Sequence, residues 1–177
     1  MKYTINITHD EYADSPREWD NLGTMVCFHR RYNLGDEHCY DKEDFNSWDE
    51  LEKQIVKDNG PCIILSVCMY EHGSIALSTS SFSCPWDSGQ IGFIFVPKSK
   101  VRSEYGYKNI TPQRRCKIEN ILSSEVSTYS HYLNGDVYGY VIEDESGEEV
   151  DSCFGFYGYD ECENEANDVL KRLENNN

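Results

Sequence analysis

The apolar residues of this chain come in short runs, and the pattern inside each run constrains the fold more than any other feature. Seven runs show the alternation or the β-branched enrichment typical of strands. These are Lys2–Thr8, Thr24–Tyr32, Cys62–Tyr70, Ser74–Ser80, Ile91–Val96, Val137–Asp144 and Glu148–Phe156. Three further segments place apolar residues three to four apart, as helices do. The order ββαβββαββα, dominated by hairpins, predicts an α+β fold with a mainly antiparallel sheet and about three helices.

Local signals mark where the helices begin and end. Ser47-Trp-Asp-Glu50 has the spacing of a capping box, and Asn59-Gly60-Pro61 is a stop signal. Thr111-Pro112 fits an N-cap followed by the first helical residue, and Asn134-Gly135 closes that segment. The third predicted helix covers Asp160–Glu174.

The composition is that of a very acidic folded domain. The chain has 177 residues, with 32 acidic and 16 basic side chains and a net charge of −16. Leu, Ile, Val and Phe make up 38 residues, about 21%, just above the level at which high charge predicts disorder. Thirteen Tyr and three Trp add burial area. We therefore expect a single α+β domain over residues 1–174, with 175–177 as a frayed tail.

Several classes of protein do not fit this sequence. No apolar run reaches the roughly 20 residues of a membrane span, and MKYTINITHDEYADS lacks the apolar centre of a secretory signal. We expect a cytoplasmic protein with its eight cysteines reduced. A charge of −16 repels phosphates, which argues against direct contact with nucleic acid or an anionic membrane. No cofactor is expected.

The charge is distributed unevenly along the chain. Residues 1–60 carry a net −7, residues 61–134 a net +2, and residues 135–177 a net −11. Seven bases lie between Lys98 and Lys117. That density is usual for exposed loops and helices and does not predict a nucleic-acid surface. The functional hypothesis is therefore based on the acidic side chains of residues 1–60 and 135–177.

Six acidic residues surround the turn of the last predicted hairpin: Glu143, Asp144, Glu145, Glu148, Glu149 and Asp151. Alternate residues of a strand share a face about 6.6 Å apart, so Glu143 with Glu145, and Glu149 with Asp151, would form rows of carboxylates. Such rows could imitate the phosphates of nucleic acid. Two alternatives are a calcium site, although the usual loop pattern is absent, and a solvated edge strand that resists aggregation.

A second candidate is the loop Ser80–Gln90, which joins two strand-like runs. Trp86 and Asp87 could anchor a partner or a ligand there, since aromatic anchors dominate interface energetics. Alternatively, Cys84 could be a nucleophile, with His72 or His131 as base and Asp87 as orienter. The loop could equally be a packed connection in which Asp87 caps a turn.

Zinc is a further alternative for four residues near the second predicted strand. Cys27, His29, His38 and Cys39 offer two thiolates and two imidazoles, a ligand set that zinc prefers. Their spacing matches no common zinc motif, so the expected metal set is none.

Three long stretches carry a resemblance: SPREWDNLGTMVCFHRRYNLGD (15–36), CPWDSGQIGFIFV (84–96) and LNGDVYGYVIEDESGEEVDSCFGFYG (133–158). They resemble segments of small acidic proteins of no assigned activity encoded by bacteriophages and related mobile elements. The resemblance implies a viral context and transfers no catalytic residue. By analogy with acidic phage inhibitors, it favours an anti-restriction or anti-CRISPR role.

These observations favour a non-enzymatic phage or mobile-element protein that binds and inhibits a basic host protein, such as a nuclease, in the bacterial cytoplasm. The six hairpin acids, with Trp86 and Asp87, are the predicted partner-binding residues. One alternative is a protein that binds a small ligand or nucleotide, or a cysteine-dependent enzyme, centred on the Cys84–Gln90 loop. Another is a protein-binding regulatory module.

Overall fold

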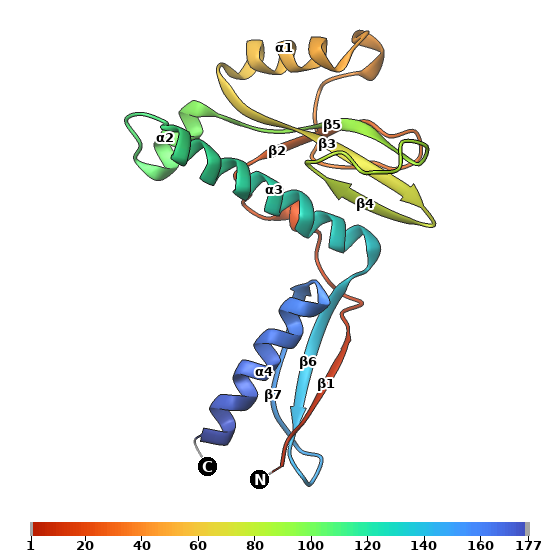
Figure 1. Ribbon diagram of the computed structural model, residues 1–177, viewed down its shortest axis with the longest axis vertical. Helices are drawn as coiled ribbons and strands as arrows, with labels where there is room; N and C mark the ends of the chain where they lie inside the picture. The colour runs from red at the N-terminus through yellow and green to blue at the C-terminus, as the bar shows by residue number, and fades with distance from the viewer. Residues whose placement is uncertain (1, 176–177) are drawn as a thin grey trace. The chain divides into compact units, whose positions relative to one another are not determined.

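The computed structural model describes residues 2–175, in which seven strands, four α-helices and two short 3₁₀-helices form (Figure 1). The strands are β1 (Thr4–His9), β2 (Thr24–Cys27), β3 (Cys62–His72), β4 (Ser74–Ser78), β5 (Ser88–Pro97), β6 (Val137–Glu143) and β7 (Glu149–Tyr157). The α-helices are α1 (Trp48–Asn59), α2 (Lys98–Tyr105), α3 (Pro112–Asn134) and α4 (Tyr159–Asn175). The 3₁₀-helices are η1 (Pro16–Glu18) and η2 (Lys42–Asp44). None of the described helices is both long and apolar enough to cross a bilayer.

The predicted α+β class is confirmed, with differences in some elements and in their bounds. Helix α2 was not predicted, because its eight residues bury only Val101 and begin without a side-chain cap. Strand β2 is shorter than predicted and ends at Cys27. Residue 175, predicted as the start of a tail, is the last residue of α4, and 176–177 lie outside the described residues.

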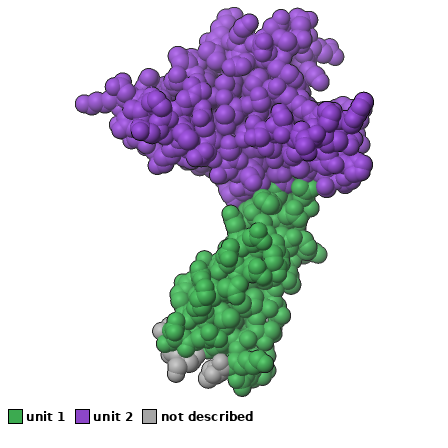
Figure 2. Space-filling view, viewed as in Figure 1, with its two compact units in different colours: residues 1–15, 131–177 green, residues 16–130 purple. Residues whose placement is uncertain are grey.

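The chain forms two compact units, shown in Figure 2. Unit 1 comprises residues 1–15 and 131–177, and unit 2 comprises residues 16–130. Each unit has its own antiparallel sheet, with strand order β1-β6-β7 in unit 1 and β2-β5-β3-β4 in unit 2. The expectation of one sheet was therefore wrong, because alternation identifies strands and does not say which of them pair. That residues 1–174 behave as a single domain stays a prediction.

In unit 1, one face of the sheet is covered by α4. Tyr140 and Ile142 of β6 pack against Cys162, Ala166 and Val169, which recur at helical spacing along α4. Burial of these side chains is the main favourable contribution to the stability of a unit this small. The opposite face of this sheet carries Phe154 of β7, whose side chain is 50% exposed.

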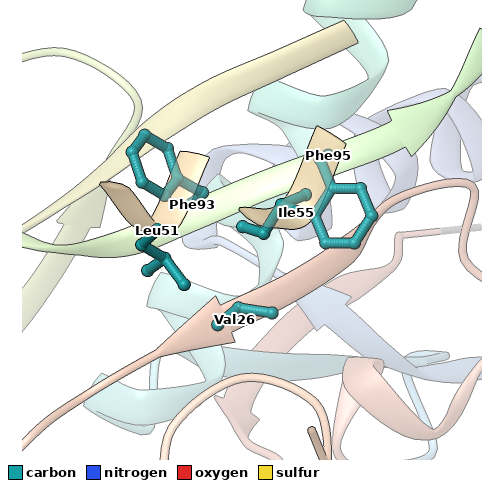
Figure 3. Close-up of a cluster of buried hydrophobic side chains, with 5 residues drawn as sticks. All are labelled: Val26, Leu51, Ile55, Phe93 and Phe95. Carbon is teal, nitrogen blue, oxygen red and sulfur yellow. The ribbon is translucent and has the colours of Figure 1, made fainter. Parts of the chain in front are cut away.

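In unit 2, α1 and α3 cover opposite faces of the four-stranded sheet (Figure 1). Figure 3 shows the α1 side, where Leu51 and Ile55 pack on Val26, Phe93 and Phe95. Val26 and Phe93 are register partners, so their side chains share that face. The predicted Ser47 cap begins α1, since the Ser47 hydroxyl accepts from the Glu50 amide at 3.3 Å. The Glu50 carboxylate accepts from the Asn46 amide at 2.9 Å, one residue before the amide that a capping box uses.

The face across the sheet packs against α3. A methyl group placed on Gly23 would lie 2.5 Å from Leu122 of α3 and 2.8 Å from Ile94 of β5. Helix and sheet therefore approach closely at this point. Gly92 of β5 is required for a different reason, because a Cβ there would lie 1.9 Å from the carbonyl oxygen of Val26.

A partly buried network of charges joins η1, β2 and α3 in unit 2. The Arg17 guanidinium, 6% exposed, pairs with Asp36 at 2.6 Å and with Glu125 at 3.3 Å. Asp36 also accepts from the Met25 amide at 2.8 Å, and Glu125 from the Leu22 amide at 2.8 Å. The remaining lone pairs of both carboxylates are thus largely satisfied, as buried ion pairs require.

Candidate functional site

The two units divide the acidic residues equally and the basic residues very unequally. Unit 1 carries 16 acidic and three basic side chains in 62 residues, a net charge of −13. Unit 2 carries 16 acidic and 13 basic side chains in 115 residues, a net charge of −3. Most of the net charge of the protein therefore belongs to its smaller unit.

The tip of the β6–β7 hairpin is a turn organised by one of the six predicted acids. The Asp144 carboxylate accepts from the Ser146 hydroxyl at 2.6 Å, the Ser146 amide at 2.8 Å and the Glu148 amide at 3.1 Å. These hydrogen bonds hold the pKa of Asp144 below its ordinary value, and the bond from the Ser146 hydroxyl has the largest effect. Asp144 is thus ionised and positioned by the turn, which is a structural role alongside its charge.

The carboxylates do not form the two rows that alternation predicted. β6 ends at Glu143, so Glu145 lies in the turn and not on the strand. The register shifts at the next position, where Glu143 pairs with Glu149 and Ile142 pairs with Asp151. Since Ile142 and Glu143 are neighbours on β6, their partners Glu149 and Asp151 lie on opposite faces. Val150 is the extra residue of a β-bulge, a feature that local sequence does not signal here.

The bulge places the hairpin acids in different surroundings. Glu149 lies directly opposite Glu143, and like charges in that arrangement destabilise a sheet. Asp151 faces the core side and accepts from the Tyr140 hydroxyl at 3.0 Å. Burial is the main cause that raises the pKa of Tyr140 to about 12, and the hydrogen bond to the Asp151 carboxylate is the second. Within residues 2–175, none of the six hairpin carboxylates forms an ion pair with a basic side chain.

Helix α4 contributes acidic residues that are not among the predicted partner-binding residues. Those on its exposed positions are Asp160, Glu161, Glu163, Glu165, Asp168 and Glu174. Two of them are paired, Asp168 with Lys171 at 2.8 Å and Glu165 with Arg172 at 2.8 Å. The helix packs on β6 and on β7, so these acids belong to the same unit as the hairpin. Their alignment on one helix was readable from the sequence, and their association with the hairpin was not.

The charge density of unit 1 is comparable with that of nucleic acid. The nine residues of β7 span about 30 Å and the 17 residues of α4 about 25 Å. Over about 25–30 Å, duplex DNA presents roughly 15–18 phosphates. Unit 1 presents 16 carboxylates and three basic side chains. Twelve of these carboxylates lie on the hairpin and on α4, so the number of charges per length is below that of the duplex but of the same order.

The other predicted site residues lie in unit 2, on the loop between β4 and β5. Trp86 is 92% exposed, which leaves its whole indole available. Asp87 fixes the loop to the β3–β4 hairpin, because its carboxylate lies 3.4 Å from His72 Nδ1 and its carbonyl accepts from the Glu71 amide at 2.8 Å. The structure therefore places Trp86 on a held loop, in a different unit from the hairpin acids.

The same loop shows no arrangement of nucleophile and base. The Cys84 thiol donates to Asp87 Oδ2 at 3.7 Å, and His72 approaches that same oxygen. The carboxylate thus stands between thiol and imidazole, whereas a cysteine nucleophile needs direct contact with its base. His131, the other candidate base, belongs to unit 1.

The residues considered for zinc are engaged separately. Cys27 is buried, and burial raises the pKa of its thiol to about 12, far from the thiolate that zinc requires. His38 Nε2 lies 3.2 Å from the Cys27 carbonyl, and His29 lies 3.8 Å from Glu71. Among the described residues, no three His, Cys, Asp or Glu side chains gather as a metal-ligand group. All eight cysteines are free thiols.

Comparisons with protein-family models, with curated proteins and with solved structures find no match for this chain. The functional argument therefore depends on the charge and geometry of its own residues.

Proposed function

We propose that this protein is a non-enzymatic inhibitor from a bacteriophage or mobile element, which acts in the bacterial cytoplasm. Its acidic unit 1 occupies the basic nucleic-acid channel of a host nuclease or defence complex. The observation that carries the proposal is the net charge of −13 confined to 62 residues.

The arrangement of the carboxylates suits such a partner. The hairpin acids form no ion pair with a basic side chain of the described chain, so their charge is available to an external cation. Long-range attraction between such a unit and a basic channel accelerates association and makes it salt-dependent. The Glu143–Glu149 pair lowers the stability of the sheet. A cost of that kind is typical of functional surfaces, where activity and stability compete.

Cleavage assays with purified restriction endonucleases and RNA-guided nucleases test this proposal. The protein is expected to inhibit DNA cleavage by at least one of them, with inhibition weakening as NaCl rises from 50 to 300 mM, since salt screens charge. A variant with all six hairpin acids changed to Gln or Asn is expected to lose at least tenfold in inhibition. The substituted residues are Glu143, Asp144, Glu145, Glu148, Glu149 and Asp151.

A matched control removes the same number of charges from unit 2. Its substituted residues are Glu37, Glu43, Asp44, Asp49, Glu52 and Asp58. The control is expected to keep most of the inhibition. Equal loss in both variants, or inhibition insensitive to salt, contradicts a role for unit 1 as the nucleic-acid substitute. Because Asp144 organises the turn, a five-acid variant that retains Asp144 separates loss of charge from loss of the hairpin.

Unit 2 favours a second candidate function, a protein-docking module anchored by Trp86. A tryptophan that is 92% exposed on a held loop is an unusual surface feature. Trp86→Ala is expected to weaken binding to the same partner without altering the stability of the fold. An unchanged affinity assigns no docking role to this loop.

A further inference from the structure

A positively charged surface lies at the corner where α2 meets the start of α3, all within unit 2. Residues 98–117 carry seven bases and a single acid, Glu104, for a net charge of +6 in a chain of net −16. Most of the bases are exposed, and the remaining two are half-buried. The seven are Lys98, Lys100, Arg102, Lys108, Arg114, Arg115 and Lys117. We call this surface the basic corner.

Two stacked tyrosines hold two of these cations in place. Tyr105 at the end of α2 and Tyr107 have ring centroids 5.4 Å apart and planes 23° from parallel. The Arg114 guanidinium lies over the Tyr107 ring at 4.2 Å, and the Lys117 ammonium over the Tyr105 ring at 5.4 Å. Cation–π contacts of this kind reduce the motion of the cations and the entropy lost when an anion binds them.

The contacts of these bases within the fold leave most of their charge unpaired. Lys100 donates to the Asn21 carbonyl at 2.9 Å and Arg114 to the Asn109 carbonyl at 2.7 Å, and both of these acceptors are neutral. Arg114 and Arg115 lie near the start of α3, whose first turn contains no acid. The helix dipole disfavours positive charge at that end. Of the seven bases, Arg115 forms an ion pair within residues 2–175, with the Glu119 carboxylate at 2.6 Å. None of the other six forms an ion pair with a carboxylate within the described chain.

Half of the 16 acids of unit 2 lie in one other segment of the chain. Residues 37–58, which include α1, carry eight acids and three bases, a net charge of −5. Helices α1 and α3 cover opposite faces of the sheet (Figure 1). Two packed layers of about 10 Å each separate their axes. That separation is about two Debye lengths at 0.1 M salt, so the acids of α1 weaken the field at α3 only slightly.

We infer that the basic corner binds the phosphodiester backbone of nucleic acid. Contacts from Lys and Arg to phosphates supply the sequence-independent part of nucleic-acid affinity. The net charge of the whole chain argues against such contact, but screening makes the local charge of the corner the relevant quantity. This inference goes beyond the proposed function, which depends on unit 1 and a basic protein.

Fluorescence anisotropy of a labelled 20-nucleotide single strand and of a 20-base-pair duplex tests the inference on the full chain. Binding is expected in 25 mM NaCl and is expected to weaken steeply towards 200 mM. Each phosphate contact contributes about 0.7 to the salt slope for a single strand and about 0.9 for a duplex. The probe that binds more tightly identifies the form of nucleic acid.

The test variant is Arg102→Glu/Arg114→Glu/Lys117→Glu, and the matched control is Lys42→Glu/Lys53→Glu/Lys57→Glu. Both change the charge of unit 2 by the same amount. The test variant is expected to lose at least tenfold in affinity and about two to three in salt slope, and the control much less. Because Arg114 and Lys117 contact tyrosines, Arg102→Gln/Lys108→Gln/Arg115→Gln provides a milder version that leaves those contacts intact.

Three outcomes overturn the inference. One is the absence of anisotropy change with either probe at 25 mM NaCl, and another is equal loss in test and control variants. The third is self-association of the wild type, measured by light scattering, that the test variant abolishes, together with no anisotropy change for either probe. That result would identify a second copy of the chain as what binds the basic corner. The six-acid variant of unit 1 is expected to bind the probes at least as well as the wild type. Failure here is therefore distinguishable from failure of the proposed function.

Discussion

Units 1 and 2 use the same construction, an antiparallel sheet packed against helix, and use charged residues in contrasting ways. In unit 2, helices cover both faces of the sheet and the Arg17 network holds three segments together. In unit 1, α4 covers one face, and the acids outnumber the bases by 16 to three. The charges of unit 2 thus contribute to its fold, whereas most charges of unit 1 oppose compaction. A unit that keeps such an excess favours an electrostatic function over maximum stability.

The sharpest way to test this contrast is to remove Arg17. Arg17→Met is expected to lower the free energy of unfolding of unit 2 by about 3–5 kcal/mol, because Asp36 and Glu125 lose the cation they share. All three tryptophans lie in unit 2, so their fluorescence in urea reports that unit. Hydrogen exchange at neutral pH is expected to show unit 1 unchanged. If the amides of unit 1 lose as much protection as those of unit 2, the two units unfold together. The contrast in how the units use charge then applies only to their surfaces.

The pH dependence of unit 1 gives an effect of intermediate size. The pKa of Tyr140 is about 12 in the folded protein, against an ordinary value near 10. An unfolded chain therefore loses this proton first, and stability falls as pH rises from 10 to 12. Tyr140→Phe is expected to reduce that fall in urea unfolding followed by circular dichroism. The wild type minus variant difference in tyrosinate absorbance is expected to titrate near pH 12. A difference that titrates near pH 10 contradicts the role of burial and of Asp151.

The smallest expected effect concerns the like-charged pair of the hairpin. Glu149→Lys replaces a repulsive partner of Glu143 by an attractive one and is expected to stabilise unit 1 by about 0.2–1 kcal/mol. Hydrogen exchange of β6 and β7 measures this gain, which is expected to shrink at high salt. Glu37→Lys in unit 2 is the matched charge change and is expected to leave these amides unaffected. Destabilisation by Glu149→Lys would show that the pair is neutralised in the folded protein.

Signals confined to a few neighbouring residues were read correctly from the sequence. The Ser47 cap and the end of α3 before Gly135 both occur where predicted. Each depends on backbone hydrogen bonds and sterics within one turn of the chain. Helix α2 was missed because one buried residue gives no periodicity. The carboxylate rows were wrong because a bulge at Val150 changes which face each acid occupies.

By itself the sequence determined the α+β class, the acidic excess, and the six acids around the last hairpin turn. Only the tertiary structure decided which acids act together. β1 pairs with β6, with Thr4 opposite Glu143, and this pairing places Asp10, Glu11 and Asp14 in the same unit as the acids of residues 135–177. It also left the bases of residues 98–117 on a surface of unit 2. Strand pairing across more than 100 residues depends on packing of the whole chain, and no local pattern encodes the partner.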